Sequence, residues 1–143
     1  MTTPTDRSTE RTSVRQVARG RADLTAAGAD ALAVLVFVLV GRRSHDEGPV
    51  VLGTLTTAWP FLAGAGLGWL AVLGLRASGR DWSASSIPAG ATVLGGSVVG
   101  GMLLRRLSGT GGTPLSFVVV VTTFLTLVLL GWRLVVLRRR PRA

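Results

Sequence analysis

The sequence predicts an all-α integral membrane protein that folds as a four-helix transmembrane bundle. Four long apolar segments follow one another along the 143 residues, and short segments that carry arginine separate them. Three of these segments, 48–75, 82–104 and 113–132, contain no charged residue. Each is at least as long as the roughly 20 apolar residues that a helix needs to cross a bilayer. Membrane helices and their connections therefore account for most of the chain.

The first predicted helix spans about residues 24–40 and contains one acidic residue, Asp30. The charge-free part that follows, 31–41, covers only roughly 16 Å as a helix, which is too short to cross a bilayer. Asp30 must therefore lie within the membrane. Ionisable side chains at this depth are costly, and they usually face a partner or a water-filled cavity.

Residues 1–23 are polar and basic, and we predict that they form a disordered cytoplasmic tail. Arginine recurs there at every fourth residue, which on a helix would make one basic stripe. The opposite face of such a helix carries too little apolar surface for firm binding to a membrane surface. Residues 138–143 are predicted to form a second basic tail, so the transmembrane domain covers residues 24–137.

The second predicted helix covers about residues 51–75, and the third covers about residues 87–104. Pro60 should kink the second helix, and Pro88 suits the first turn of the third. Both helices carry glycines at a four-residue spacing, which lets membrane helices approach closely: Gly64 and Gly68, and Gly96 and Gly100. We predict that these glycines pack the two helices together, and dimerisation through the same motif is the alternative.

The fourth predicted helix covers about residues 114–137, with Thr113 as its cap and Pro114 in its first turn. Arg133 lies near the end of this helix, at about the same depth as Asp30. We predict that Asp30 and Arg133 form an intramembrane ion pair. The pair either joins the first and fourth helices or belongs to a proton or ion relay. We favour a structural pair that holds the first and fourth helices together, because no second acid lies in any predicted helix.

The net charge is +9, and all sixteen basic residues are arginine. If the four helices cross in alternating directions, twelve arginines lie on the side of both termini and four lie on the other side. Positively charged segments stay in the cytoplasm, which predicts a multi-pass protein of the cell membrane with both termini cytoplasmic. Because the arginines flank apolar segments, we expect membrane lipids as partners and no nucleic acid.

Four arginines are predicted to emerge together on the outer side, where they form a candidate anion patch: Arg42, Arg43, Arg105 and Arg106. The fourth helix points its N-terminus, the positive end of its dipole, towards the same surface. The alternative is that these side chains only reach the head groups of the outer leaflet. We expect a lipid phosphate as the anion if the patch binds one.

Several classes of functional site are excluded or unexpected. The chain has no cysteine and one histidine, so it cannot form a disulfide, a thiolate site or a multi-histidine metal site. His45, Asp46 and Glu47 are adjacent and point in different directions, which favours a solvated loop over a metal site. No nucleophile elbow or carboxylate pair is present. We expect no catalytic residue, no metal, no cofactor and no enzymatic activity.

Three stretches of the chain resemble an uncharacterised family of membrane proteins, domain of unknown function three-zero-five-four. They are 41–45 (GRRSH), 57–69 (TAWPFL followed by GW) and 101–133 (GMLLRRL, SFV and GWR). The resemblance covers about residues 24–137, and the pair Ile87–Pro88 stands where the family would have Trp-Pro. It implies a small integral membrane protein, and it implies no activity.

Taken together, these features predict a structural, accessory or interaction protein of the membrane. The alternative is a small carrier or binding protein for an anionic solute or a lipid head group. Besides lipids, a second copy of the chain or another membrane protein remains open as a partner.

Overall fold

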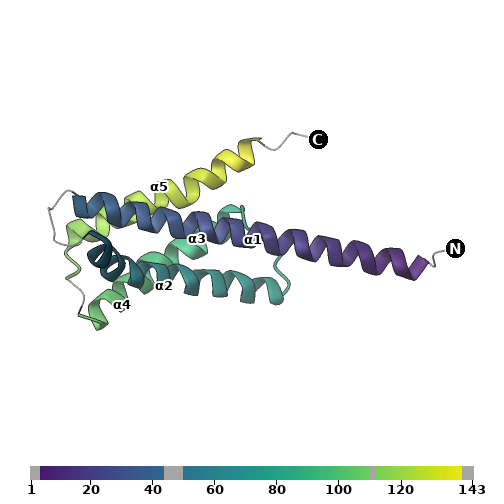
Figure 1. Cartoon of the computed structure of the whole chain (residues 1–143), viewed down its shortest axis with the longest axis horizontal. Coiled ribbons are helices and arrows are strands. Elements are labelled where there is room, and N and C mark those ends of the chain that lie inside the picture. The colour runs from purple at the N-terminus through teal and green to yellow at the C-terminus, as the bar shows by residue number, and fades with distance from the viewer. Residues whose placement is uncertain (1–3, 44–49, 110–111, 140–143) are drawn as a thin grey trace.

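The described part of the chain contains six helical segments, and they form four rods of membrane length, whose arrangement Figure 1 shows. The computed structural model describes residues 4–43, 50–109 and 112–139. Its elements are α1 (Pro4–Arg43), α2 (Val50–Ala77), α3 (Ile87–Gly95), η1 (Gly96–Gly100), α4 (Gly101–Leu107) and α5 (Leu115–Arg139). Because these ranges contain helices and no strand, the predicted all-α fold is confirmed for the described residues.

Among the described residues, four stretches are long and apolar enough to cross a membrane: Glu10–Arg42, Val51–Ala77, Ile87–Leu107 and Leu115–Arg139. The third stretch runs through α3, η1 and α4 without a break. Successive rods run in opposite directions, so that α1 begins and α5 ends at the same end of the bundle (Figure 1). We call this the terminal end, and we call the end where α1 stops and α5 starts the opposite end.

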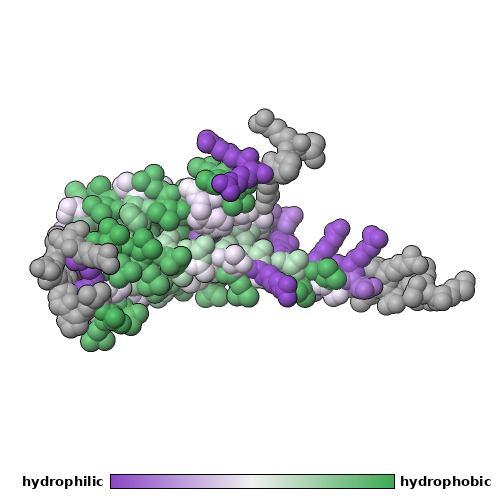
Figure 2. Space-filling model, turned by 45° about the horizontal axis from the view of Figure 1, so that its top comes forward, coloured by the Kyte–Doolittle hydropathy of each residue, from purple (hydrophilic) through white to green (hydrophobic). Residues whose placement is uncertain are grey.

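Apolar side chains cover the outside of the bundle, as expected for a surface that faces lipid. Leu70, Leu115 and Leu127 are each more than 60% exposed. Figure 2 shows hydrophobic residues over the body of the bundle and hydrophilic residues towards the terminal end. A soluble protein rarely exposes apolar patches of this extent. The surface therefore agrees with the four membrane-length helices.

The core holds a cluster of four phenylalanine rings near the opposite end. Phe37 lies with its ring centroid 5.4 Å from that of Phe124 and 6.2 Å from that of Phe61, which it meets edge to face. Phe117 lies 6.0 Å from Phe61 and completes the cluster. Such aromatic pairs add to the stabilisation from apolar burial. They fix α1, α2 and α5 against one another.

The prediction of a disordered N-terminal tail is wrong for residues 4–23, which continue α1 as helix; residues 1–3 lie outside the described part. The tail contains no proline after Pro4, and it is joined to an apolar helix, so it extends a helix that already exists and needs no new nucleus. Arg19 also bonds Asp81 across the terminal end, at 2.9 Å. Arg138 and Arg139, predicted as tail, form the last turn of α5.

The glycine interface between α2 and the third span exists, but one predicted member differs. A Cβ on Gly64, Gly68 or Gly96 would meet backbone atoms of the other helix at 2.5–2.6 Å. A Cβ on Gly100 would make only an ordinary contact of 3.4 Å, whereas one on Gly101 would meet the Phe61 ring at 2.7 Å. The reason is η1, a π-helical turn with i→i+5 bonding, which places residues five apart on one face.

Candidate functional site

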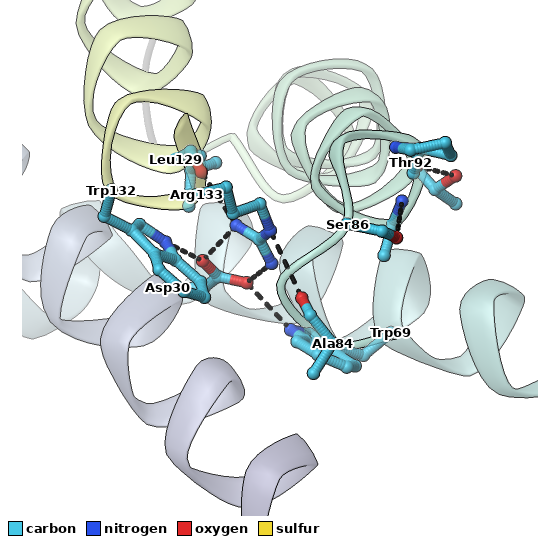
Figure 3. Close-up of polar contacts among 10 residues, drawn as sticks. Asp30, Trp69, Ala84, Ser86, Thr92, Leu129, Trp132 and Arg133 are labelled. Atoms are coloured by element: carbon cyan, nitrogen blue, oxygen red, sulfur yellow. Dashed lines mark hydrogen bonds and ion pairs between the residues drawn. The ribbon is translucent and has the colours of Figure 1, made fainter. Parts of the chain in front are cut away.

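Asp30 and Arg133 meet inside the bundle, as the sequence predicts. Asp30 is 1% exposed and Arg133 is 0% exposed, although both are charged. Arg133 donates from Nη1 to Asp30 Oδ1 and from Nη2 to Asp30 Oδ2, both at 2.8 Å (Figure 3). This two-pronged geometry is the strongest form of the arginine–carboxylate contact.

Two tryptophans complete the shell around the carboxylate (Figure 3). Trp132 donates its Nε1–H to Asp30 Oδ1, and Trp69 donates its Nε1–H to Asp30 Oδ2, each at 3.1 Å. Each carboxylate oxygen thus accepts one bond from the guanidinium and one from an indole. A buried indole N–H is a donor that needs an acceptor, so the same contacts satisfy the two tryptophans.

The rest of the guanidinium is bonded to backbone. Arg133 donates from Nη1 to the carbonyl of Leu129 at 2.8 Å and from Nε to the carbonyl of Ala84 at 3.3 Å. Ala84 lies in the connection before α3, so this contact attaches that connection to α5. Through Asp30, Trp69 and Ala84, Arg133 joins α1, α2 and the approach to α3 at one point.

Gly90 of α3 provides the space in which Arg133 lies. A Cβ at Gly90 would come within 2.6 Å of Arg133 Cδ and 2.8 Å of its Nε. It would also come within 3.0 Å of Leu130 Cδ2. The Arg133 side chain cannot yield easily, because its bonds hold it from several sides. The absence of a side chain at residue 90 is therefore part of the site.

We expect Gly90→Ala to destabilise the protein by about 1–3 kcal/mol, the usual cost of forcing extra atoms into a packed core. The measurement is thermal unfolding in detergent. Gly95→Ala is the matched control, because a Cβ there has no atom within 4 Å. Equal melting temperatures for the two variants would contradict the role of Gly90.

The sequence did not identify Trp69, Trp132 or Gly90 as members of the site. A usable signal existed for the tryptophans, because an indole N–H within an apolar span must find an acceptor, and Asp30 is the only acid in the predicted helices. No sequence signal distinguishes Gly90 from the glycines that only allow helices to approach.

The network closes Asp30 on all sides. Both of its oxygens accept two bonds, and neither cavity described below is lined by Asp30 or Arg133. Asp30 and Arg133 thus connect α1 and α5 through hydrogen bonds that lie inside the bundle.

A cavity of about 480 Å³ lies at the opposite end, and two of the four arginines of the predicted anion patch line it, Arg42 and Arg105. Its other walls are mostly apolar, with Phe37, Phe117 and Val120 among them. Arg106 is exposed and is not part of the lining. The side chain of Arg43 lies outside the described residues.

Each cavity arginine is held in place. The Arg105 guanidinium lies over the Phe117 ring, 4.9 Å from its centroid, and its Nε donates to the carbonyl of Gly112 at 3.2 Å. The Arg42 guanidinium lies directly against Gly53 of α2, where a side chain would collide with it. Two of the predicted arginines, Arg42 and Arg105, therefore border an apolar cavity with guanidinium groups that are held in place.

His45, Asp46 and Glu47 lie outside the described residues. Within 4–43, 50–109 and 112–139, no three histidine or acidic side chains gather as a metal site would require.

Comparison with known proteins gives one match. Residues 27–136 match a family described as "Protein of unknown function (DUF3054)". No curated protein and no solved structure matches the chain. The matched range includes Asp30 and its shell, the arginines of the cavity, and the glycines between α2 and the third span.

Proposed function

The chain belongs to the DUF3054 family of proteins of unknown function, and we propose that it is a membrane protein that binds an anionic amphiphile. The bound molecule lies in the cavity at the opposite end, with its anionic group on Arg42 and Arg105. Its apolar part contacts the aromatic wall. The protein is neither an enzyme nor a through-carrier in this proposal.

The observation that carries the proposal is the composition of the cavity. Ligand sites are mostly apolar, with a few polar groups placed to orient the ligand. Here the polar groups include two guanidiniums, which bind phosphate or carboxylate through paired N–H donors. Phe37 and Phe117 supply apolar wall beside them. A phospholipid combines both requirements, because it carries an anionic head group next to an acyl chain.

The closed shell around Asp30 supports binding without transport. A carrier for ions or protons needs ionisable groups that reach water from one side, whereas both charges of this pair are held by neighbouring groups. A structural or accessory role is the second candidate, and the same closed core favours it. In that role the bundle would contact another membrane protein or a second copy of the chain.

The binding role predicts that Arg42→Lys with Arg105→Lys lowers retention of anionic lipid about tenfold, or ~1.4 kcal/mol. The net charge is unchanged, but lysine lacks the paired donors of arginine. The protein would be equilibrated with vesicles of phosphatidylglycerol and phosphatidylcholine, extracted, and measured by native mass spectrometry.

Arg106→Lys is the matched control, since Arg106 is next to Arg105 and does not line the cavity. This control should retain as much phosphatidylglycerol as the parent. Equal retention by the parent and the double variant would contradict the binding role and leave the accessory role.

We also propose that the terminal end lies in the cytoplasm and the cavity in the outer leaflet of the cell membrane. The support is the distribution of arginine, with twelve residues on the terminal side and four on the other.

The topology can be tested with single cysteines, because the chain contains none. A cysteine at Gly112 should react with an impermeant thiol reagent in intact cells, whereas one at Ser13 should react only after the cells are opened. The reverse pattern would overturn the orientation.

A further inference from the structure

We propose that Arg76 forms a second anion site, at the terminal end of the bundle, that takes a phosphate group. The phosphate belongs either to a lipid head group or to a soluble phosphate ion. This site is separate from the cavity of Arg42 and Arg105, and the argument for it does not depend on that cavity.

The side chain of Arg76 is almost fully buried, and only one of its three nitrogens donates a hydrogen bond to the described residues. It lies in the last turn of α2, and its side chain is 9% exposed. Its Nη1 donates to both carboxylate oxygens of Asp23 in α1, each at 2.8 Å. Its Nε and Nη2 are buried and have no hydrogen-bond partner among the described residues. A buried donor without an acceptor is destabilising, so these two nitrogens favour an acceptor from outside the described residues.

The two unpaired nitrogens form one edge of the guanidinium. The Nε–H and one Nη2–H point in parallel, and such a pair matches two oxygens of a phosphate or carboxylate. Asp23 does not compete for this edge, since it is bonded to Nη1 on the other side of the group. The geometry thus leaves Arg76 held by one acid, with the edge formed by Nε and Nη2 still without an acceptor among the described residues.

A shallow cavity of about 480 Å³ adjoins this arginine. Arg19 and Arg80 line it together with Arg76, and its two acids, Asp23 and Asp81, are already paired. Asp81 bonds Arg19 at 2.9 Å, so Arg80 contributes a positive charge that no lining acid offsets. The lining therefore has a net positive charge, which favours an anion.

The position of the site indicates phosphate as the anion. The cavity lies where α2 ends and the connection to α3 begins, next to Trp82, whose ring the Arg80 guanidinium approaches to 5.4 Å. Tryptophan and arginine at the end of a membrane helix lie at the depth of the lipid head groups. Phosphate is the common anion at that depth, and a phosphate ion reaches it from the cytoplasm.

The test replaces Arg76 by lysine. Lysine keeps the charge that faces Asp23 but lacks the free edge. Vesicles of phosphatidic acid and phosphatidylcholine supply the lipid phosphate, and inorganic phosphate supplies the soluble one. We expect retention of phosphatidic acid, measured by native mass spectrometry, to fall about tenfold when Arg76→Lys is added to the variant Arg42→Lys with Arg105→Lys, in which the other anion site is already weakened. Arg139→Lys, an exposed change at the same end, should behave as the parent.

Two further measurements identify the source of the phosphate and test the proposal on the parent protein, where misfolding of a variant plays no part. If inorganic phosphate raises the melting temperature of the parent and displaces phosphatidic acid, the site accepts both sources. If inorganic phosphate does neither, while phosphatidic acid raises the melting temperature, the site is specific for the lipid. Full retention after Arg76→Lys is added to the variant Arg42→Lys with Arg105→Lys overturns the proposal. So does a parent whose melting temperature neither phosphatidic acid nor phosphate raises, a result that does not depend on how any variant folds. The variant Arg42→Lys with Arg105→Lys should still bind phosphate at Arg76. A failure of the Arg76 proposal can therefore be distinguished from a failure of the proposed function, which depends on Arg42 and Arg105.

Discussion

Replacing Asp30 by alanine should destabilise the protein by about 3–5 kcal/mol, the usual cost of removing one partner of a buried ion pair. The change leaves Arg133 charged, fully buried and without its carboxylate. It also removes the acceptor of two indole N–H groups, those of Trp69 and Trp132. The loss would be measured by thermal unfolding in detergent.

The double variant Asp30→Ala with Arg133→Leu should recover a large part of this loss, because no buried charge remains. If the losses of the two single variants simply add, the residues are not energetically coupled. Asp23→Ala is the matched control. It also breaks an arginine–aspartate pair, but Asp23 is 21% exposed, so its loss should be smaller.

The membrane spans and the Asp30–Arg133 contact could be predicted because both follow from one strong constraint. Apolar length defines a membrane helix, and a single acid inside it requires a partner. The structure places the pair where that constraint requires it. The tryptophan shell follows from the same logic, applied to N–H groups instead of charges.

The predictions for the N-terminal tail and for the anion patch differ from the structure for another reason. Each depends on contacts with parts of the chain that lie outside the local sequence. Residues 4–23 are helical because they extend an existing helix, although their composition is typical of disorder. Arg42 and Arg105 line the cavity, where they lie against Gly53 and Phe117, whereas Arg106 is not part of the lining. Contacts of this kind appear only when the helices are packed.

Within the third span, Gly101 makes the close contact with α2 that the sequence predicts for Gly100. This difference also depends on a feature that the local sequence does not reveal. A four-residue spacing is correct for an α-helix, and Gly64 and Gly68 obey it in α2. The third span contains a π-helical turn, so Gly96 and Gly101 face α2 at a five-residue spacing. Ser97 of this turn is fully buried and donates its hydroxyl to the carbonyl of Phe61 at 3.1 Å.

Gly96→Ala should be the most damaging of the glycine substitutions in the third span. Its Cβ would lie 2.6 Å from the carbonyl oxygen of Gly64 and 2.7 Å from the nitrogen of Gly68. Both are backbone atoms, so they cannot rotate away as a side chain does, and the two helices would have to separate. We expect destabilisation of at least about 3 kcal/mol, the upper end of the usual cost of overpacking.

Gly100→Ala and Gly101→Ala make the test of Gly96→Ala specific, because all three changes replace a glycine in the same helical span. A Cβ at residue 100 has its nearest neighbour at 3.4 Å, so Gly100→Ala should be neutral or stabilising through the better helix propensity of alanine. Gly101→Ala should be intermediate, since its closest contact is with a ring carbon of Phe61 at 2.7 Å and its nearest backbone atom, the Cα of Phe61, lies farther away at 3.1 Å. Thermal unfolding of the three variants in one detergent should therefore rank Gly100→Ala above Gly101→Ala and Gly101→Ala above Gly96→Ala. If Gly100→Ala were instead the least stable, the glycines of this span would follow the α-helical spacing, and the π-helical turn would not position the interface.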